Sequence, residues 1–295
     1  MIGAHTARQL PNTRYSTGPV VAGPLFSDMQ PPILIDKPLG MTPLKALELL
    51  RREHAIPATV KLAYAGRLDP MATGLLPVLQ GEQLQRQEEY WYLPKRYEAT
   101  VLVGIRTDSY DLLGIPERLE MPVPTPERIT AVVRGLVGKT YLAVPVYSSY
   151  RHEGKPLFAW AKEETDGPPV VPVRRMSVAQ IDIVSMGTID TSVLRDIVRK
   201  RIPLVEGDFR QSETIDAWNR VLKTSGEWAT VDLDIHCGSG TYVRSLAHEL
   251  GRRLGAGLPA EQAGAMVLGL RRTQVGPWRV SDPMVVRLSS PQSAS

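Results

Sequence analysis

Residues 66–76 read GRLDPMATGLL, a loop with one aspartate that runs directly into an apolar stretch. Taken by itself, Asp69 before Pro70 is most often a residue that initiates a turn. A structural role would therefore be the first interpretation. Whether Asp69 has a chemical role depends on the segments that accompany this loop along the chain.

Alternation of inward and outward residues predicts two half-buried strands after this loop. From residue 96 to 103, Tyr97 shares one face with alanine and two valines, whereas charged residues and threonine share the other face. Residues 231–237 alternate in the same way and end at the glycine turn 238–240. We expect Tyr97 on the inner face of its strand.

Capping residues and leucine spacing predict two helices near these strands. Thr42 and Pro43 form an N-cap and first-turn pair, and the helix should continue to about His54. The second helix follows the glycine turn, with Thr241 expected as its cap and Gly251 as its stop. Strand, glycine turn and helix would then form one unit.

The chain divides into one large domain with appendages. We expect a catalytic domain over residues 31–280, with an inserted pair of amphipathic helices at about 187–226. Residues 1–30 are punctuated by Gly and Pro and should form a flexible extension rather than an organelle transit peptide. Residues 281–295 have the composition of a frayed tail.

Composition excludes several classes of protein. The 35 Lys and Arg residues exceed the 31 Asp and Glu residues by four, which is compatible with a polyanionic partner but does not demonstrate one. The single cysteine, Cys237, excludes an intrachain disulfide and a multi-cysteine zinc site, and it favours a reducing compartment. Scattered histidines give no metal spacing. No apolar run approaches a membrane span, so we expect a cytoplasmic protein without metal or membrane partners.

Two glycine-containing segments could bind phosphate. Gly138-Lys139-Thr140 resembles the end of a P-loop, but the glycine required five positions before Gly138 is Val133, which argues against a nucleotide hydrolase. The turn at 238–240 enters a helix and could bind a phosphate through backbone N–H groups. Most such turns are only tight connections, so the turn at 238–240 could be either a phosphate site or a simple connection.

Six segments follow one another in a fixed order between about residues 33 and 280. They are DKPLGMT at 36–42, GRLDPMATG at 66–74, KRYEA with GIRTDSYD within 95–111, VPVYSS with GKPL within 144–157, SGTYVRSL at 239–246 and LRRT at 270–273. In this order they resemble the motifs of the TruB-type tRNA pseudouridine synthases, and the set is far more specific than any single motif.

The chain departs from the family pattern at three positions. Tyr64 stands where a histidine is usual, and Pro43 and Val146 stand where serine and proline are common. We expect these changes to affect RNA docking rather than the core chemistry. Only some two dozen residues follow Arg272, so we also expect the family's small RNA-binding PUA domain to be absent.

The resemblance assigns the chemistry to three residues. An aspartate carboxylate can attack the sugar or stabilise positive charge on it, and this role falls to Asp69. Arg244 would hold that carboxylate ionised and oriented, with Arg67 as a weaker candidate. Tyr97 would stack on the flipped base and relay a proton. The sequence leaves open whether a covalent adduct or an unsaturated sugar forms.

Five further residues are candidates for substrate binding. Tyr242 and Leu270 would line the pocket, although both could be ordinary core residues. Lys37, Asp111 and Lys155 are candidate RNA contacts, with exposed structural charge as the alternative.

The resemblance implies an α+β fold with a mixed, largely antiparallel sheet and flanking helices. It also implies a monomeric, cofactor-free enzyme that isomerises the T-arm uridine at tRNA position 55. A non-enzymatic alternative is an RNA-folding chaperone on the same scaffold, and the intact Asp69, Tyr97 and Arg244 favour the enzyme.

Overall fold

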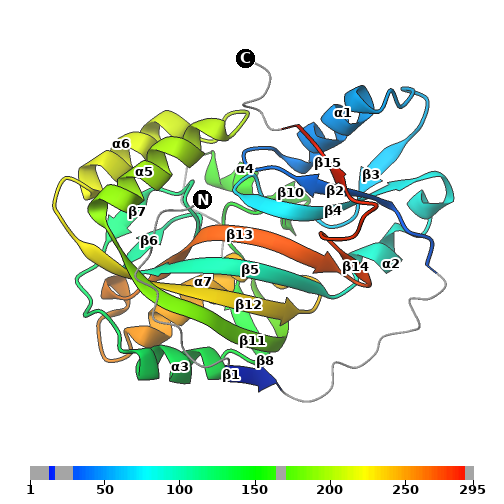
Figure 1. Ribbon diagram of the computed structural model, residues 1–295. Coiled ribbons are helices and arrows are strands. Elements are labelled where there is room, and N and C mark those ends of the chain that lie inside the picture. The colour runs from blue at the N-terminus through cyan, green and yellow to red at the C-terminus, as the bar shows by residue number, and fades with distance from the viewer. Residues whose placement is uncertain (1–12, 17–28, 164–170, 290–295) are drawn as a thin grey trace.

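One large twisted sheet organises the molecule (Figure 1). The computed structural model describes residues 13–16, 29–163 and 171–289. Within them an eleven-stranded sheet has the order β1-β11-β12-β5-β13-β4-β2-β15, with β8 beside β11, β3 beside β4 and β14 beside β13. The β13–β4 and β15–β2 pairs are parallel and the other pairs are antiparallel. The expected α+β class with a mixed, largely antiparallel sheet is confirmed.

The strands of the large sheet are β1 Thr13–Ser16, β2 Ile33–Lys37, β3 Leu62–Tyr64, β4 Ala72–Gln80, β5 Lys95–Val103, β8 Gly138–Ala143, β11 Val173–Asp190, β12 Glu227–Cys237, β13 Ala265–Val275, β14 Trp278–Arg279 and β15 Val286–Arg287. Two small ribbons pair β6 Ile105–Thr107 with β7 Pro116–Arg118, and β9 Arg151–His152 with β10 Lys155–Pro156. The α-helices are α1 Pro43–Glu53, α2 Gln87–Trp91, α3 Pro126–Arg134, α4 Leu157–Ala161, α5 Thr191–Arg201, α6 Gln211–Val221 and α7 Val243–Leu254, and the 3₁₀ turns are η2 Gly81–Leu84, η3 Ile202–Leu204 and η4 Ala260–Gln262.

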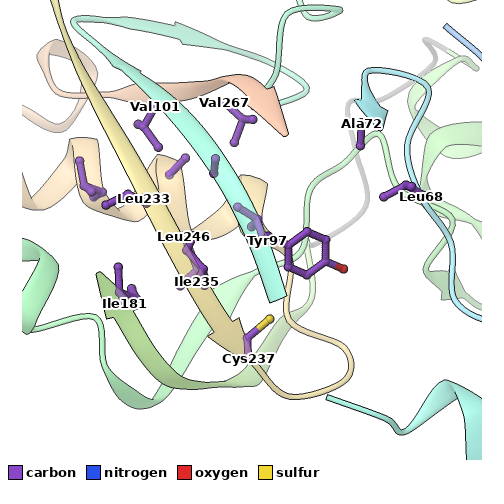
Figure 2. Close-up of a cluster of buried hydrophobic side chains, with 14 of the residues drawn as sticks. Leu68, Ala72, Tyr97, Val101, Ile181, Leu233, Ile235, Cys237, Leu246 and Val267 are labelled. Carbon is purple, nitrogen blue, oxygen red and sulfur yellow. The ribbon is translucent and has the colours of Figure 1, made fainter. Parts of the chain in front are cut away.

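The main core lies between the sheet and helices α3 and α7, and α7 lies behind the sheet in Figure 1. The inward residues of β5 and β12 meet there, with Tyr97 opposite Ile235 in the antiparallel register. Figure 2 shows Tyr97 at one end of this row of side chains, with its hydroxyl directed away from Val101, Leu233 and Ile235. The alternation read from the sequence is therefore confirmed for both strands.

A second core lies beneath α5 and α6, at the upper left of Figure 1. Trp218 and Leu194 are fully buried there against residues of β5 and β13. The predicted helical pair is thus confirmed, but β11 continues to Asp190, whose carboxylate caps α5, so the helical part begins after residue 187. That the pair is an insertion stays a prediction.

Short edge strands correct the prediction for both ends of the chain. Within the expected extension 1–30, residues 13–16 form β1 on the edge of β11, while residues 1–12 and 17–28 lie outside the described residues. Within the expected tail 281–295, β15 pairs with β2 and Leu288 is buried in the main core. Edge strands present unpaired N–H and C=O groups, which these short segments satisfy whatever their composition.

The α7 helix differs from its prediction at both ends. Thr241 does not cap it, because the Thr241 hydroxyl hydrogen-bonds the backbone of Ser177, and Tyr242 occupies the cap position without a side-chain bond. Gly251 does not stop it, and the helix continues to Leu254. Gly251 is instead where α7 touches the sheet, since a Cβ there would lie 2.1 Å from the backbone nitrogen of Ala265.

Among the described residues, no helix combines the length and apolarity that a membrane crossing requires.

The close contact at Gly251 predicts the sign of a substitution. Gly251→Ala should lower the free energy of unfolding by about 3 kcal/mol, because the new methyl group collides with the β13 backbone. Without that contact, replacing glycine by alanine within a helix would raise the free energy of unfolding by about 1 kcal/mol. Urea unfolding measures the change, and Gly238→Ala, whose Cβ would meet nothing closer than 3.5 Å, is the control. A Gly251→Ala protein as stable as the wild type would contradict the packing.

Candidate active site

A pocket of about 300 Å³ lies where β5 and β13 approach the loop of residues 66–71. It brings together residues from five separate parts of the chain, among them Asp69, Tyr97, Tyr150, Arg244 and Arg272. A hollow of about 510 Å³ lies beside the C-terminal end of α7, and one of about 410 Å³ lies between the sheet and Arg201 at the end of α5. The smaller pocket is the candidate active site because it alone of these three contains the predicted aspartate and arginine.

Asp69 and Arg244 form an ion pair at the base of this pocket, with 2.8 Å between Oδ2 and Nε. The Asp69 side chain is 38% exposed, whereas that of Arg244 is only 4% exposed. The Nε hydrogen has no aligned acceptor, so the contact is a close charge pair rather than a linear hydrogen bond. The carboxylate thus faces the pocket while its counter-ion is enclosed by protein.

Backbone carbonyls fix the rest of the Arg244 guanidinium. Nη1 donates to the Ser109 carbonyl at 2.8 Å, and Nη1 and Nη2 both donate to the Tyr147 carbonyl at 3.2 Å. These two carbonyls belong to loops that follow β6 and β8. The planar guanidinium therefore has one orientation, and its charge is directed at Asp69.

Asp111 is a second, buried carboxylate beside Arg244, 3.7 Å from Nε. Its Oδ1 accepts hydrogen bonds from the Ser109 hydroxyl at 2.6 Å and the Leu113 N–H at 3.0 Å. The expected RNA contact through Asp111 is therefore wrong, because the side chain is enclosed and its oxygens have protein partners. Burial raises the pKa of Asp111. For Arg244, burial alone would lower the pKa, but the negative charges of Asp69 and Asp111 outweigh it, and the pKa is raised.

Tyr97 forms the apolar wall of the pocket. Its ring is 9% exposed, and Figure 2 places the hydroxyl on the side of Leu68, which precedes Asp69. Burial raises the pKa of the Tyr97 phenol, so the group stays protonated near neutral pH. Tyr242 and Leu270 are half-buried and line the same pocket while packing against the main core. They are thus both lining and core residues, and their role towards a substrate stays a prediction.

Lys37 is fully buried, so the expected RNA contact through this side chain is wrong. Its ammonium group donates to the carbonyls of Pro38 and Met41 at 2.9 and 2.8 Å. These bonds fold residues 37–41 into a tight loop whose Gly40 N–H donates to the Pro70 carbonyl at 2.9 Å. Lys37 thereby supports the loop that carries the aspartate. Burial lowers its pKa to about 7, against the opposing effect of the Asp69 charge.

Two other predicted cations lie differently. Lys155 forms an ion pair with Glu163 and lies 4.3 Å from the ring centroid of Trp160, and it does not line the pocket. Its contact with RNA stays a prediction. Arg67 has an exposed side chain, and among the described residues no ion pair joins it to Asp69, so Arg244 is the holder of the carboxylate.

Arg272 lines the pocket, although the sequence analysis assigned it no role. It is 1% exposed and donates to the carbonyls of Leu75, Arg67 and Gly66 at 2.7, 3.0 and 3.4 Å. The aspartate loop is thus tied to β13 on both of its sides. The available signal was an arginine two positions after Leu270, where strand alternation places the side chain inward.

The pocket combines three chemically different groups. A half-exposed carboxylate faces the pocket, a buried cation orients it, and a protonated phenol borders it. The described residues contain no cluster of three or more His, Cys, Asp or Glu side chains suited to a metal ion. Such an arrangement suits nucleophilic or charge-stabilising chemistry at a sugar carbon.

Comparison with known proteins points to one family. The family model for the N-terminal domain of the TruB family pseudouridylate synthases matches residues 53–198. The tRNA pseudouridine synthase B of Lactobacillus delbrueckii subsp. bulgaricus is 31% identical over 258 residues, which cover 86% of this chain and 71% of that protein. The proteins of the same name from Aromatoleum aromaticum and Ralstonia nicotianae are 29% and 32% identical, and the matches cover 66% and 64% of their lengths. The chain therefore spans about two thirds of these relatives.

Among solved structures, a chain of the archaeal box H/ACA sRNP Nop10-Cbf5 complex matches at 19% identity and a TM-score of 0.49, covering 96% of this chain and 58% of that chain. The fold class rests on the sheet and helices themselves.

The Arg272 contacts predict a large stability loss on truncation. Arg272→Ala should lower the free energy of unfolding by about 3 kcal/mol, because buried carbonyls lose their donor and a cavity opens in the sheet. Guanidinium chloride unfolding measures the loss. The neighbouring Arg271→Ala is the matched control, since Arg271 pairs with Asp36 at the partly exposed face and should change stability by about 1 kcal/mol or less. Equal losses for the two variants would refute the support role.

Proposed function

Because this chain belongs to the TruB family of pseudouridylate synthases, we propose that it isomerises uridine to pseudouridine at position 55 in the T loop of tRNA. The observation that carries the proposal is the pairing of Asp69 with Arg244 in a pocket bordered by Tyr97. The relatives of the same family named above are tRNA pseudouridine synthases.

The reaction needs little beyond one ionised carboxylate. The N1–C1′ bond breaks, the uracil rotates, and a C5–C1′ bond forms while C5 loses a proton and N1 gains one. Asp69 starts either route to this product, by attack on C1′ or by removal of a proton from C2′ to give an unsaturated sugar. No electron or external group enters, so we propose that the enzyme uses no cofactor and no metal.

Arg244 and Asp111 prepare the carboxylate for this task. The buried guanidinium attracts the negative charge of Asp69 and orients its carboxylate, with Nε 2.8 Å from Oδ2. Asp111 balances part of the Arg244 charge and, through Ser109, orders the loop that carries one of the two carbonyl acceptors. The geometry therefore predicts that a fork-shaped guanidinium is needed at this position, not only a positive charge.

The pocket walls suit a base that has been swung out of its RNA loop. Tyr97 offers a flat face for stacking, and Tyr242 and Leu270 would confine the uracil while it rotates. Arg174, which lies 5.3 Å from the ring centroid of Tyr150 at the pocket wall, is placed for a phosphate. Since one chain supplies every group named here, we propose that a monomer is active, in the cytoplasm with its tRNA substrate.

The carboxylate itself gives the sharpest test of catalysis. Asp69→Asn should abolish pseudouridine formation and leave tRNA binding within about twofold, because the amide keeps the size of the side chain but cannot attack or stabilise a cation. Carbodiimide mapping of pseudouridine in an unmodified tRNA transcript gives the product and its position, and a filter-binding assay gives the affinity. Turnover at the wild-type rate in Asp69→Asn would remove this assignment, and wild-type protein that binds tRNA without product would favour an RNA chaperone.

Recognition of the T arm as a local shape gives a second test. Since the candidate site is one pocket of about 300 Å³, we expect a T-arm hairpin to be converted as full tRNA is, including in the presence of EDTA. Added salt should weaken binding without moving the modified position. Conversion of full-length tRNA alone would show that contacts outside the T arm are required, and loss of activity in EDTA that added metal restores would show a metal requirement.

A further inference from the structure

Helix α6 supports the loop of residues 107–114, which carries Asp111 and the Ser109 carbonyl. The Thr214 hydroxyl donates to the Leu113 carbonyl at 3.1 Å, and the Trp218 indole N–H donates to the Leu112 carbonyl at 3.1 Å. Both donor side chains are fully buried. The residues directly after Asp111 are therefore hydrogen-bonded to a helix that supplies no wall of the active-site pocket.

Arg210, at the start of α6, extends this support to two loops at once. Its Nη2 donates to Asp108 at 3.0 Å, and its guanidinium carbon lies 4.3 Å from the ring centroid of Tyr147. Asp108 directly precedes Ser109 in the chain. The two segments that Arg210 joins are thus the two whose carbonyls, from Ser109 and Tyr147, hold Arg244.

The backbone of Arg210 adopts a conformation that side chains disfavour. Its φ angle of 59° lies in the left-handed region, where a residue with a Cβ is disfavoured and glycine is not. The same loop makes a second connection through the Glu206 N–H, which donates to the Gly40 carbonyl at 3.1 Å. The segment between α5 and α6 therefore touches both the loop that steadies Asp69 and the loops that steady Arg244.

We propose that Arg210 is a positioning residue, which holds Asp108 and Tyr147 together so that their loops present Arg244 to Asp69 in one orientation. The inference rests on the proposed function for its catalytic readout. It gives the helical segment 191–221 a role, namely to order the active-site loops before the RNA arrives. The physical reason is that a small displacement of an orienting group lowers the rate of a reaction that depends on alignment.

Three variants separate positioning from folding. Arg210→Gly removes the guanidinium and at the same time suits the left-handed backbone, so the protein should keep its thermal stability. Arg210→Lys keeps a positive charge but not the planar fork. Arg220→Ala, an exposed arginine near the other end of α6, is the matched control for loss of charge from the same helix.

Steady-state kinetics on unmodified tRNA should show a loss in kcat alone. We expect Arg210→Gly to lower kcat by about tenfold or more with KM within about twofold of wild type, Arg210→Lys to recover part of the loss, and Arg220→Ala to match wild type. Unchanged kcat in Arg210→Gly would overturn the inference. A raised KM with normal kcat would overturn it too, because it would identify Arg210 as an RNA contact.

Hydrogen exchange tests the inference without any turnover. In Arg210→Gly the amides of residues 108–115 should exchange faster than in wild type or Arg220→Ala, including that of Ile115, which donates to Asp108 at 2.9 Å. Identical exchange in the three proteins would contradict the positioning role even if the wild type is active. A wild type without product would contradict the proposed function alone, since the exchange result still decides whether Arg210 orders the loops.

Discussion

The buried guanidinium of Arg244 is the constraint on which the rest of the site depends. A charge enclosed by protein is costly unless it is paired and hydrogen-bonded, and removal of one partner leaves the others uncompensated. Arg244 meets this requirement with Asp69, Asp111 and the carbonyls of Ser109 and Tyr147. Since these partners come from three separate loops, satisfying one cation fixes the relative positions of all three.

Several cations lie in or near the Asp69 pocket, and burial shifts the pKa of the lysines among them. Lys37 and Lys95 each have their pKa lowered to about 7, chiefly by burial, and Arg272 lowers that of Lys95 further. A lysine can lose its proton in this environment, whereas an arginine retains its own. Of the buried arginines, Arg244 faces the carboxylate and Arg272 holds the backbone of the aspartate loop.

Each of the two cores supports a different part of the candidate active site. The main core between the sheet and α7 places Tyr97 and Arg244, whereas the second core beneath α5 and α6 secures the loop of residues 107–114. Fully buried side chains such as Trp218 combine both tasks, since the indole packs in the second core while its N–H bonds the loop. Rigid elements far from the pocket can thus order flexible connections that line it.

The sequence alone located several elements and the candidate residues that the structure brings together in the pocket. Alternation located β5 and β12, Thr42 and Pro43 located the start of α1, and six ordered motifs located Asp69, Tyr97 and Arg244. These features depend on near neighbours in the chain or on residue types at fixed positions. They can be read without knowing which segments meet.

Only the tertiary structure decided what the other polar residues do. Lys37 and Asp111 were expected to be exposed and are buried. Arg272 has its role because it bonds carbonyls about 200 positions away in the chain. The edge strands β1 and β15 form because the sheet offers them unpaired backbone groups. The stop expected at Gly251 failed because α7 needed a residue without a side chain against β13. Burial, hydrogen-bond partners and close packing depend on contacts between distant segments, and the spacing of residues along the chain does not contain them.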